Sequence, residues 1–561
     1  MRIKRFITAI LLLALCLSFT GCKESTKYNV SYIDYYGNEI KNETIKSLED
    51  FNETPCESVT DNGKTYCFYG WNKEIVDNQI TATALYYQQM EDTKMSLTNA
   101  DIFKPDFSLY NTNSVLVVYV SFTDGYQIDK NSFEDMFVGN YEGIDSMRSV
   151  SSYFRETSGG KNLLDFDFYY YDCNMTSAEA WHLVNDEDSY GDYYGNYFVF
   201  DIFEDIRKEN DLKHLDKNND GFVDACIFVL GDTLTDGRYI YGGASGNAKG
   251  YDFSADFNNP EIGNYVKTEA YYVFEQLQPG SSAHENTRML IHEISHLFGI
   301  VDYYDYAEYQ GEIFDTLGSF DMQSYDLGGW NPFSKMTCDF LSPYVITNDI
   351  DDITLKLSAG NEAILIPTSC GYNDTPYDEY ILIDVLSKEG PNGFDWSYIS
   401  NENSDCNKDG GVRIYHVDAR LVETYFDYSY KHNIYNPVND FCNYDIQNTT
   451  FNYRFPNSNG VDPNIEGDSR FYHLIEIVPR DGTSKYRKCT PQSTIESNNA
   501  FTFFNVNDLF GVGDSFSVDT HYNCFANGKM MNNGGTLDYV VTVLDYNGET
   551  GNALINIKRK Y

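Results

Sequence analysis

The sequence predicts a multidomain protein with three parts: a small β-rich module near the N-terminus, a mixed α/β domain, and a C-terminal β-sandwich region. The chain has 561 residues, more than one hydrophobic core usually serves, because domains typically contain about 100–200 residues. Apolar strand-like runs alternate with helical stretches in its middle, as in α/β and α+β domains. Beyond residue 350 the strands are separated by loops rich in Gly, Asn and Asp, which is typical of a β-sandwich.

The N-terminus has the pattern of an export signal. Basic residues precede an almost wholly apolar run from Phe6 to Phe19, which is too short to span a bilayer comfortably. Small residues then lead to Cys22, and residues 1–22 resemble a bacterial lipoprotein signal in which that cysteine becomes lipidated. We therefore expect a lipid anchor at Cys22 on the extracellular face of the bacterial cell membrane. An ordinary cleaved signal, and hence secretion, is the alternative.

Composition narrows the classes of function. The formal net charge is −45, and so acidic a chain repels phosphates, which argues against nucleic-acid binding. Twelve cysteines include no Cys-x-x-Cys pair, which argues against a cysteine-ligated zinc site. Cys56 and Cys67 fall within one small module and could form a disulfide in an exported protein.

The N-terminal module follows a short polar tether at residues 23–27. Residues 28–88 contain "YNVSYIDYYGNEI", with a turn at Tyr36-Gly37-Asn38, and then the strand-like runs "YCFYGWN" and "ITATALYY". This order resembles the small β-grasp repeats of bacterial surface proteins, of the internalin B-repeat type. The resemblance implies a spacer or adhesion module, and a generic β-domain is the alternative. Residues 89–112 read as a linker to the next domain.

A helix within residues 113–348 has the pattern of a zinc site. Apolar residues recur along Leu290–Phe298 with the spacing of one helical stripe. His292 and His296 are four residues apart, so they project from one face of the helix and can reach a single zinc ion. Glu293 follows the first histidine directly, which places its carboxylate beside the metal, where it can act as the general base for a water molecule.

A third ligand is expected just after this helix, because a catalytic zinc ion usually has three protein ligands. Gly299 can take the sharp turn that brings the chain back towards the metal. The spacing His-Glu-x-x-His-x-x-Gly-x-x-Asp then places Asp302 where the metzincin pattern has its third His. Asp305 is the alternative ligand. A different class of zinc site would use a glutamate further downstream. Glu308 and Glu312 follow the helix, but both lie nearer to it than that class normally places its ligand.

The segment Gly318–Asp326 contains two further candidates. Met322 lies at a distance that suits the Met-turn beneath the metal of metzincin-like enzymes, although a lone Met is more often core filler. Tyr325 could stabilise a developing oxyanion.

These motifs together resemble the immune-inhibitor-A family of secreted bacterial metallopeptidases. The resemblance is strongest in "HEISHLFGIVDYYD" and "GSFDMQSYDLGGWNPFSKMTCDFLSPYVI", and it extends to "VLVVYVSFTD" upstream and "GGVRIYHVD" downstream, over residues 113–561. It implies a metzincin-like α/β (α+β) catalytic domain at residues 113–348 and a β-rich region at residues 349–561. The implied activity is extracellular, zinc-dependent and often calcium-dependent hydrolysis of host or environmental proteins. The chain departs from the family in its lipid anchor, in its N-terminal module, and in Ile-Val-Asp after Gly299.

A possible calcium loop precedes the strand-like run at Val223. It has the form Asp-x-Asn-x-Asp-Gly-x-x-Asp, in which alternate side chains carry oxygen and a Gly permits a sharp turn. A polar turn without an ion is the alternative. The oxygen-bearing residues are Asp216, Asn218, Asp220 and Asp224.

Peptide hydrolysis is therefore the leading functional hypothesis. The competing class is a surface adhesion or binding lipoprotein with a vestigial zinc-peptidase fold, which the anchor and the N-terminal module would suit. Glu293 discriminates between the two, because a binding relic would have no need of a general base.

Overall fold

The computed structural model shows several β-sheets and few helices, arranged in two compact units. The first unit comprises Met1–Met90 with Ile353–Lys356, and the second comprises Glu91–Asp352 with Leu357–Tyr561. Several sheets with few helices confirm a multidomain chain of mixed α and β structure. The structure describes residues 27–102, 107–125, 128–140, 148–179, 202–203, 205–217, 223–231, 243–245, 272–276, 283–303, 316–400, 409–427, 432–437, 452–454, 473–483 and 508–560.

The first unit is a five-stranded sheet in the order β2-β1-β5-β4-β3. The strands β1 and β5, which are the first and last of the five along the chain, pair in parallel. The other pairs are antiparallel. The predicted turn at Gly37 forms with φ 82°, and a small core gathers around Val30, Tyr32 and Ile80. Cys56 and Cys67 are free thiols here, so the disulfide considered above is not formed. The elements are β1 (Tyr28–Ile33), β2 (Glu39–Ile45), η1 (Leu48–Asp50), β3 (Val59–Asp61), β4 (Lys64–Val76) and β5 (Gln79–Gln88).

The second unit begins with a largely parallel sheet in the order β7-β6-β8-β10-β9. Its members are β6 (Asn111–Ser121), β7 (Asn162–Asp172), β8 (Ala225–Gly231), β9 (Gly243–Ser245) and β10 (Tyr272–Gln276). The interior strand β6 carries a continuous apolar run because both of its faces are covered. Val115, Val117 and Tyr119 face one core, and the alternate side chains face a second core.

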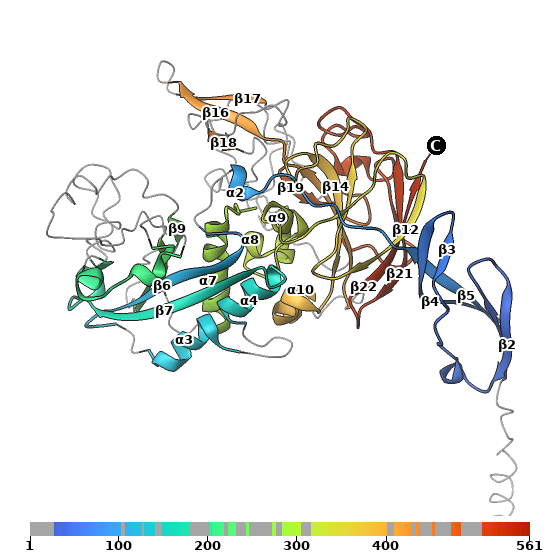
Figure 1. Cartoon of the computed structure of the whole chain (residues 1–561), viewed down its shortest axis with the longest axis horizontal. Helices are drawn as coiled ribbons and strands as arrows, with labels where there is room; N and C mark the ends of the chain where they lie inside the picture. The colour runs from blue at the N-terminus through green and yellow to red at the C-terminus, as the bar shows by residue number, and fades with distance from the viewer. Residues whose placement is uncertain are drawn as a thin grey trace, which may run out of the picture. The chain divides into compact units, whose positions relative to one another are not determined.

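Three helices cover one face of this sheet (Figure 1). They are α3 (Lys130–Val138), α4 (Val150–Thr157) and α7 (Ala283–Ser295), with η2 (Lys213–Leu215) on the opposite side. The side chains of Asp129 and Ser149 accept hydrogen bonds from the first turns of α3 and α4 and thereby fix where these helices begin.

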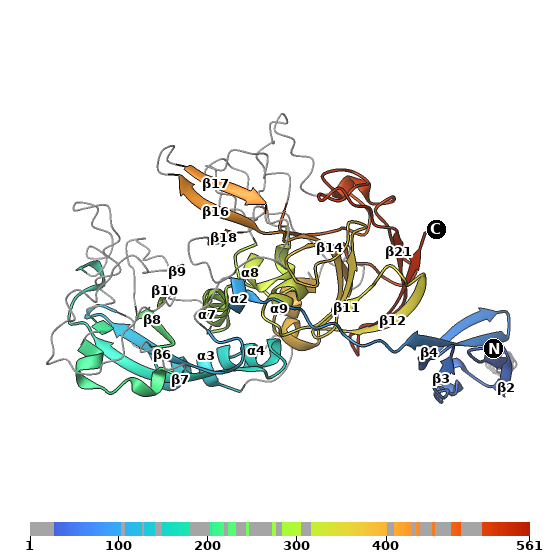
Figure 2. The ribbon, with the colours of Figure 1, turned by 45° about the horizontal axis from the view of Figure 1, so that its top comes forward.

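Residues 89–112 were expected to be a linker, but described residues within this stretch pack into the second unit. Met95, Phe107 and Leu109 are buried in its main core. The short helix α2 (Asn99–Ile102) lies beside the end of α7 in both views (Figures 1 and 2). The Asn99 amide donates to the carbonyl of Phe298 at 3.1 Å. A sequence pattern gives little sign of such packing because the contacts join residues about two hundred positions apart.

The C-terminal β region carries a five-stranded sheet in the order β11-β13-β14-β15-β19. Its members are β11 (Tyr344–Val345), β13 (Ile364–Pro367), β14 (Glu379–Leu386), β15 (Gly411–Asp418) and β19 (Ile475–Ile477). The strand β12 (Asp352–Ser358) precedes β13 in the chain. Three antiparallel neighbours are β20 (Ser515–Phe516), β21 (Tyr539–Asn547) and β22 (Asn552–Arg559). A separate three-stranded sheet contains β16 (Val422–Asp427), β17 (His432–Pro437) and β18 (Asn452–Arg454). Short helices are η4 (His296–Phe298), η6 (Gly318–Phe320), α8 (Met322–Tyr325), α9 (Pro332–Thr337), η7 (Gly390–Asp395), α10 (Trp396–Ser400) and η11 (Tyr522–Cys524).

One apolar core joins the central sheet to the C-terminal β region. It contains Val117 of β6 and Leu290 of α7 together with Leu365, Tyr380 and Tyr415 of the C-terminal sheet. The boundary expected between residues 348 and 349 therefore lies inside one compact unit. Among the described residues no helix is long and apolar enough to cross a membrane. Residues 1–22, with the expected lipidation at Cys22, lie outside the described residues.

Candidate metal centre

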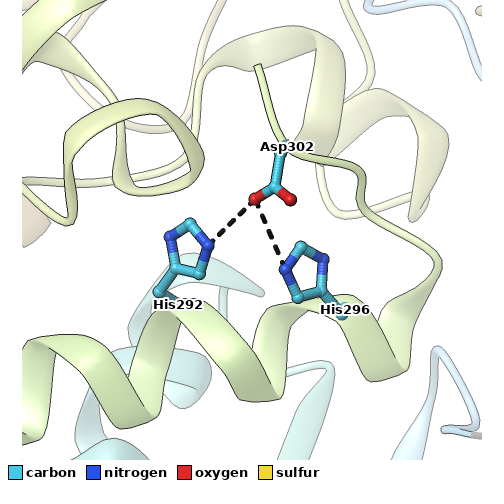
Figure 3. Close-up of side chains that lie close together, drawn as sticks. All are labelled: His292, His296 and Asp302. Atoms are coloured by element: carbon cyan, nitrogen blue, oxygen red, sulfur yellow. Dashed lines mark ion pairs between the residues drawn. The ribbon is translucent and has the colours of Figure 1, made fainter. Parts of the chain in front are cut away.

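The two histidines of the predicted site lie on α7 and its continuation η4. One face of the helix is fixed by Leu290, Ile291 and Ile294, which are at most 2% exposed. The chain then turns at Gly299, which adopts the expected left-handed conformation with φ 76° and donates to the carbonyl of His296 at 2.9 Å. This turn sends the chain back over the two imidazoles, so that Asp302 faces their Nε2 atoms (Figure 3).

His292, His296 and Asp302 meet at a single point (Figure 3). The carboxylate oxygen Oδ1 of Asp302 lies 2.9 Å from Nε2 of His292 and 3.4 Å from Nε2 of His296. One ligand atom from each residue lies within 4.8 Å of the others. His292 and Asp302 are only 5% and 7% exposed. The three residues that the sequence placed together could therefore hold one metal ion.

The remaining ring nitrogens are held by acceptors that fix the tautomers. Nδ1 of His292 donates to the carbonyl of Met322 at 2.9 Å and lies 2.7 Å from Oδ1 of Asp326. Nδ1 of His296 donates to the carbonyl of Ile300 at 2.8 Å. A carbonyl can only accept, so both Nδ1 atoms carry hydrogen, and it is the two Nε2 atoms that face Asp302 and would become the ligand atoms on losing their protons. Metal-binding histidines are usually held in this way.

The electrostatics of the trio favour a positive charge at its centre. Burial lowers the pKa of His292, but hydrogen bonds with Asp302 and Asp326 outweigh it and raise that pKa well above its ordinary value. Burial also lowers the pKa of His296, but its hydrogen bond with Asp302 outweighs this effect and raises that pKa above its ordinary value. Burial would raise the pKa of Asp302, but the two imidazoles hold it far below its usual range. A metal ion would take over the role of these protons as the positive partner of the carboxylate.

The turn containing Met322 lies directly behind His292. Asp321 caps α8 by accepting from the amide of Gln323 at 2.8 Å, and its other oxygen accepts from the amide of Asn331 at 2.6 Å. Burial raises the pKa of Asp321 to about 6, although these hydrogen bonds oppose the rise. Met322 is 1% exposed and packs in the main core, while its carbonyl contacts His292. Met322 is therefore a core residue whose backbone contacts His292, and its assignment as a Met-turn stays a prediction.

Glu293 lies half-buried on α7 between the two histidines in sequence, and its charge contributes to the raised pKa of His296. Tyr325 ends α8, but its side chain lies outside the described residues. The alternative ligands Asp305, Glu308 and Glu312 lie outside them as well.

The structure describes two of the four residues of the predicted calcium loop. Asn218 and Asp220 lie outside the described residues, whereas Asp216 and Asp224 lie within them. The buried carboxylate of Asp224 accepts from the amide of Ser114 at 2.9 Å and from the amide of Lys217 at 3.2 Å. It thus ties this loop to β6, and calcium binding stays a prediction.

Two contributors to the site were missed from the sequence. Asp326 contacts Nδ1 of His292, and its only signal was its position four residues after Met322, in a left-handed conformation with φ 54°. The side-chain amide of Asn99 donates to the carbonyls of Phe298 and Gly299, just after the helix that carries the two histidines. Its place in a presumed linker gave no signal.

No protein-family model matches this chain, and no curated protein matches it. Its function is therefore inferred from the motif and from the geometry of the site.

Proposed function

We propose that this protein is a zinc-dependent endopeptidase that hydrolyses peptide bonds in proteins outside the cell. The observation that carries the proposal is the buried convergence of His292, His296 and Asp302, with Glu293 directly after the first histidine. Two imidazole nitrogens and one carboxylate oxygen suit zinc, and three protein ligands are the usual number in a catalytic zinc site. On both imidazoles a carbonyl holds the Nδ1 hydrogen, so Nε2 is the atom that would bind zinc after losing its proton.

The chain supplies the acid–base chemistry that such a reaction needs. Zinc, when bound, polarises a carbonyl and lowers the pKa of a coordinated water to about 7. In the proposed mechanism Glu293 accepts a proton from the attacking water and later delivers it to the leaving amine. Asp302 balances the positive charge of the centre. The carbonyls of Met322 and Ile300 keep the two imidazoles in position.

The wider proposal combines this chemistry with the sequence resemblance. It includes a metzincin-like domain of the immune-inhibitor-A type, a lipid anchor at Cys22 that holds the protein on the cell surface, and an added role for calcium. A surface adhesion lipoprotein with a vestigial site is the second candidate. The trio at His292, His296 and Asp302 occurs together with Glu293, which favours the enzyme, because a site that only binds has no need of a base beside the metal.

The decisive test is a comparison of Glu293→Gln with the wild type in protein comprising residues 23–561. We expect the wild type to hydrolyse casein or gelatin and chelation to stop it. Glu293→Gln should lose the activity while retaining zinc, measured by metal analysis after desalting, because the glutamine cannot take a proton. Glu209→Gln, an exposed residue of the same domain, is the matched control and should behave as wild type. Equal hydrolysis by wild type and Glu293→Gln would refute the assigned role.

A further inference from the structure

The turn behind His292, Thr316–Asp326, is hydrogen-bonded at its first residue to the C-terminal β region. Thr316 lies alongside β19, where its hydroxyl donates to the carbonyl of Ile475 at 2.6 Å. The amide of Ile477 donates back to the carbonyl of Thr316 at 3.1 Å. The segment that leads to Met322 is therefore fixed to a strand that lies more than a hundred residues later in the chain.

Arg413 of β15 makes the next contact with this turn. Its Nη1 donates to the carbonyl of Phe320 at 2.8 Å, and its Nε donates to Oδ1 of Asp384 at 2.8 Å. Nη2 donates to the other oxygen of Asp384. Arg413 and Asp384 are 3% and 5% exposed. A guanidinium is planar and rigid, so the two bonds to Asp384 on β14 fix the direction of the third donor.

The Phe320 carbonyl lies two residues before the carbonyl that orients His292. Between them Asp321 caps α8, and the positive charge of Arg413 partly offsets the effect of burial on the pKa of this carboxyl. Contacts thus run without a break from Asp384 through Arg413 to Phe320, and along the turn to Met322 and His292. Arg413 thus donates a hydrogen bond to the Phe320 carbonyl, one residue before the carboxylate that caps α8.

A second set of contacts connects the C-terminal β region to α7. Asp395 of η7 accepts from the amide of Gly328 at 2.8 Å, just beyond the turn. Its other oxygen lies 3.9 Å from Nη1 of Arg288, which is one helical turn before His292. Both the helix and the turn are therefore in contact with residues that follow the central domain.

We propose that Arg413 is a positioning residue for the metal centre, acting through the Phe320–Met322 backbone on the imidazole of His292. The C-terminal β region is then part of the metal-binding unit. The inference rests on the metal centre of the proposed function, but it does not depend on peptide hydrolysis, because its consequence is metal affinity.

The test is zinc affinity, measured on residues 23–561 by competition with a chromophoric chelator. The double variant Arg413→Met/Asp384→Leu removes the contact to Phe320 without leaving either charge buried alone, which proteins often tolerate. Loss of a group that orients a metal ligand typically weakens binding about 10- to 100-fold, and we expect a loss of about tenfold here. Arg413→Lys should also weaken binding, because an ammonium cannot hold both Asp384 oxygens and the carbonyl in the same planar arrangement.

Arg420→Met is the matched control. Arg420 forms a comparable two-bond pair with Asp418 at the end of the same strand, with distances of 2.7 and 2.8 Å. Asp418 and its other partner, Glu379, both lie outside the Thr316–Asp326 turn. Arg420→Met should leave the zinc affinity within about twofold of the wild-type value, because among the described residues Arg420 does not contact a group that orients a metal ligand. Wild-type affinity in Arg413→Lys or in the folded double variant would overturn the inference, as would an equal loss in Arg420→Met. A wild type that binds zinc tightly but cleaves no protein would refute the proposed enzyme and leave this test intact.

Discussion

His292 makes contacts through both ring nitrogens, and the contact at Nδ1 determines what Nε2 can do. Met322 offers a carbonyl and Asp326 a carboxylate oxygen, at 2.9 and 2.7 Å. A histidine that donates to a carboxylate becomes a more basic ligand, and its ring is held in one orientation. Asp302 thus contacts Nε2 of His292, while Met322 and Asp326 of the turn behind the helix hold its Nδ1.

A second buried histidine, His416, predicts how stability depends on pH. Its Nε2 lies 2.8 Å from Glu379, its Nδ1 lies 3.0 Å from Glu476, and Arg420 approaches Glu379 at 3.9 Å. Burial lowers the pKa of His416, but the two carboxylates outweigh it and raise that pKa to about 9. Since this is above the value in the unfolded chain, about 6.5, the stabilisation is complete below pH 6.5 and is lost as pH rises to 9.

We expect the difference in unfolding free energy between wild type and His416→Gln to shrink across that interval. Linkage gives a change on the order of 3 kcal/mol. Urea unfolding of both proteins at several pH values, with zinc at saturation, would measure it. A difference that stays constant from pH 6 to 9 would show that His416 is neutral in the folded protein.

At the scale of elements, the helix that carries the ligands could be predicted and its supports could not. The spacing of His292 and His296 and the apolar stripe beside them are local patterns with a helical period. The return of Asp302 also follows locally, because Gly299 permits the turn. The contacts of Asn99 and Arg413 depend on where distant segments pack. Hydrophobic periodicity carries no information on such pairings.

Gly299→Ala tests whether the turn after the helix positions Asp302. Its φ of 76° disfavours a side chain, and an added Cβ would lie 3.4 Å from atoms of Asn99. The left-handed conformation costs a non-glycine residue about 1–2 kcal/mol. We expect a comparable loss of stability, measured by urea unfolding, together with weaker zinc binding in the chelator competition.

Gly513→Ala supplies the control for this substitution. Gly513 has φ 87°, and an added Cβ would meet nothing within 4 Å. It should show the backbone cost while zinc affinity stays unchanged. If Gly299→Ala and Gly513→Ala lowered stability equally and neither altered zinc binding, the turn would have no role in presenting Asp302.

On the scale of the whole molecule, the division into units differs from the division that the sequence suggested. Residues 28–88 were expected to form a module, and the first unit contains that stretch with its own small core. The central and C-terminal regions were expected to be separate, yet one core includes Phe298 beside the metal ligands and Ile475 of β19. The sequence pattern distinguishes these two regions, because strand-like runs alternate with helical stretches in one and follow one another, separated by polar loops, in the other. It cannot show that they share a core.

This shared core leads to a prediction for two truncated chains. A chain of residues 91–561 retains every described contact of the metal centre, because the core around Val30 and Tyr32 shares no described residue with the core beneath α7. It should bind zinc with wild-type affinity in the chelator competition.

A chain of residues 91–348 loses Arg413, β19 and the apolar side chains Leu365, Tyr380 and Tyr415, which are 0–1% exposed. Deleting single buried side chains of this size costs about 2–5 kcal/mol each, so losing several exceeds the roughly 5–15 kcal/mol that stabilises a typical domain. We expect this shorter chain to lack a cooperative unfolding transition and to bind zinc weakly. A cooperative transition together with wild-type zinc affinity in residues 91–348 would instead establish that the central region forms the metal centre without the C-terminal sheet.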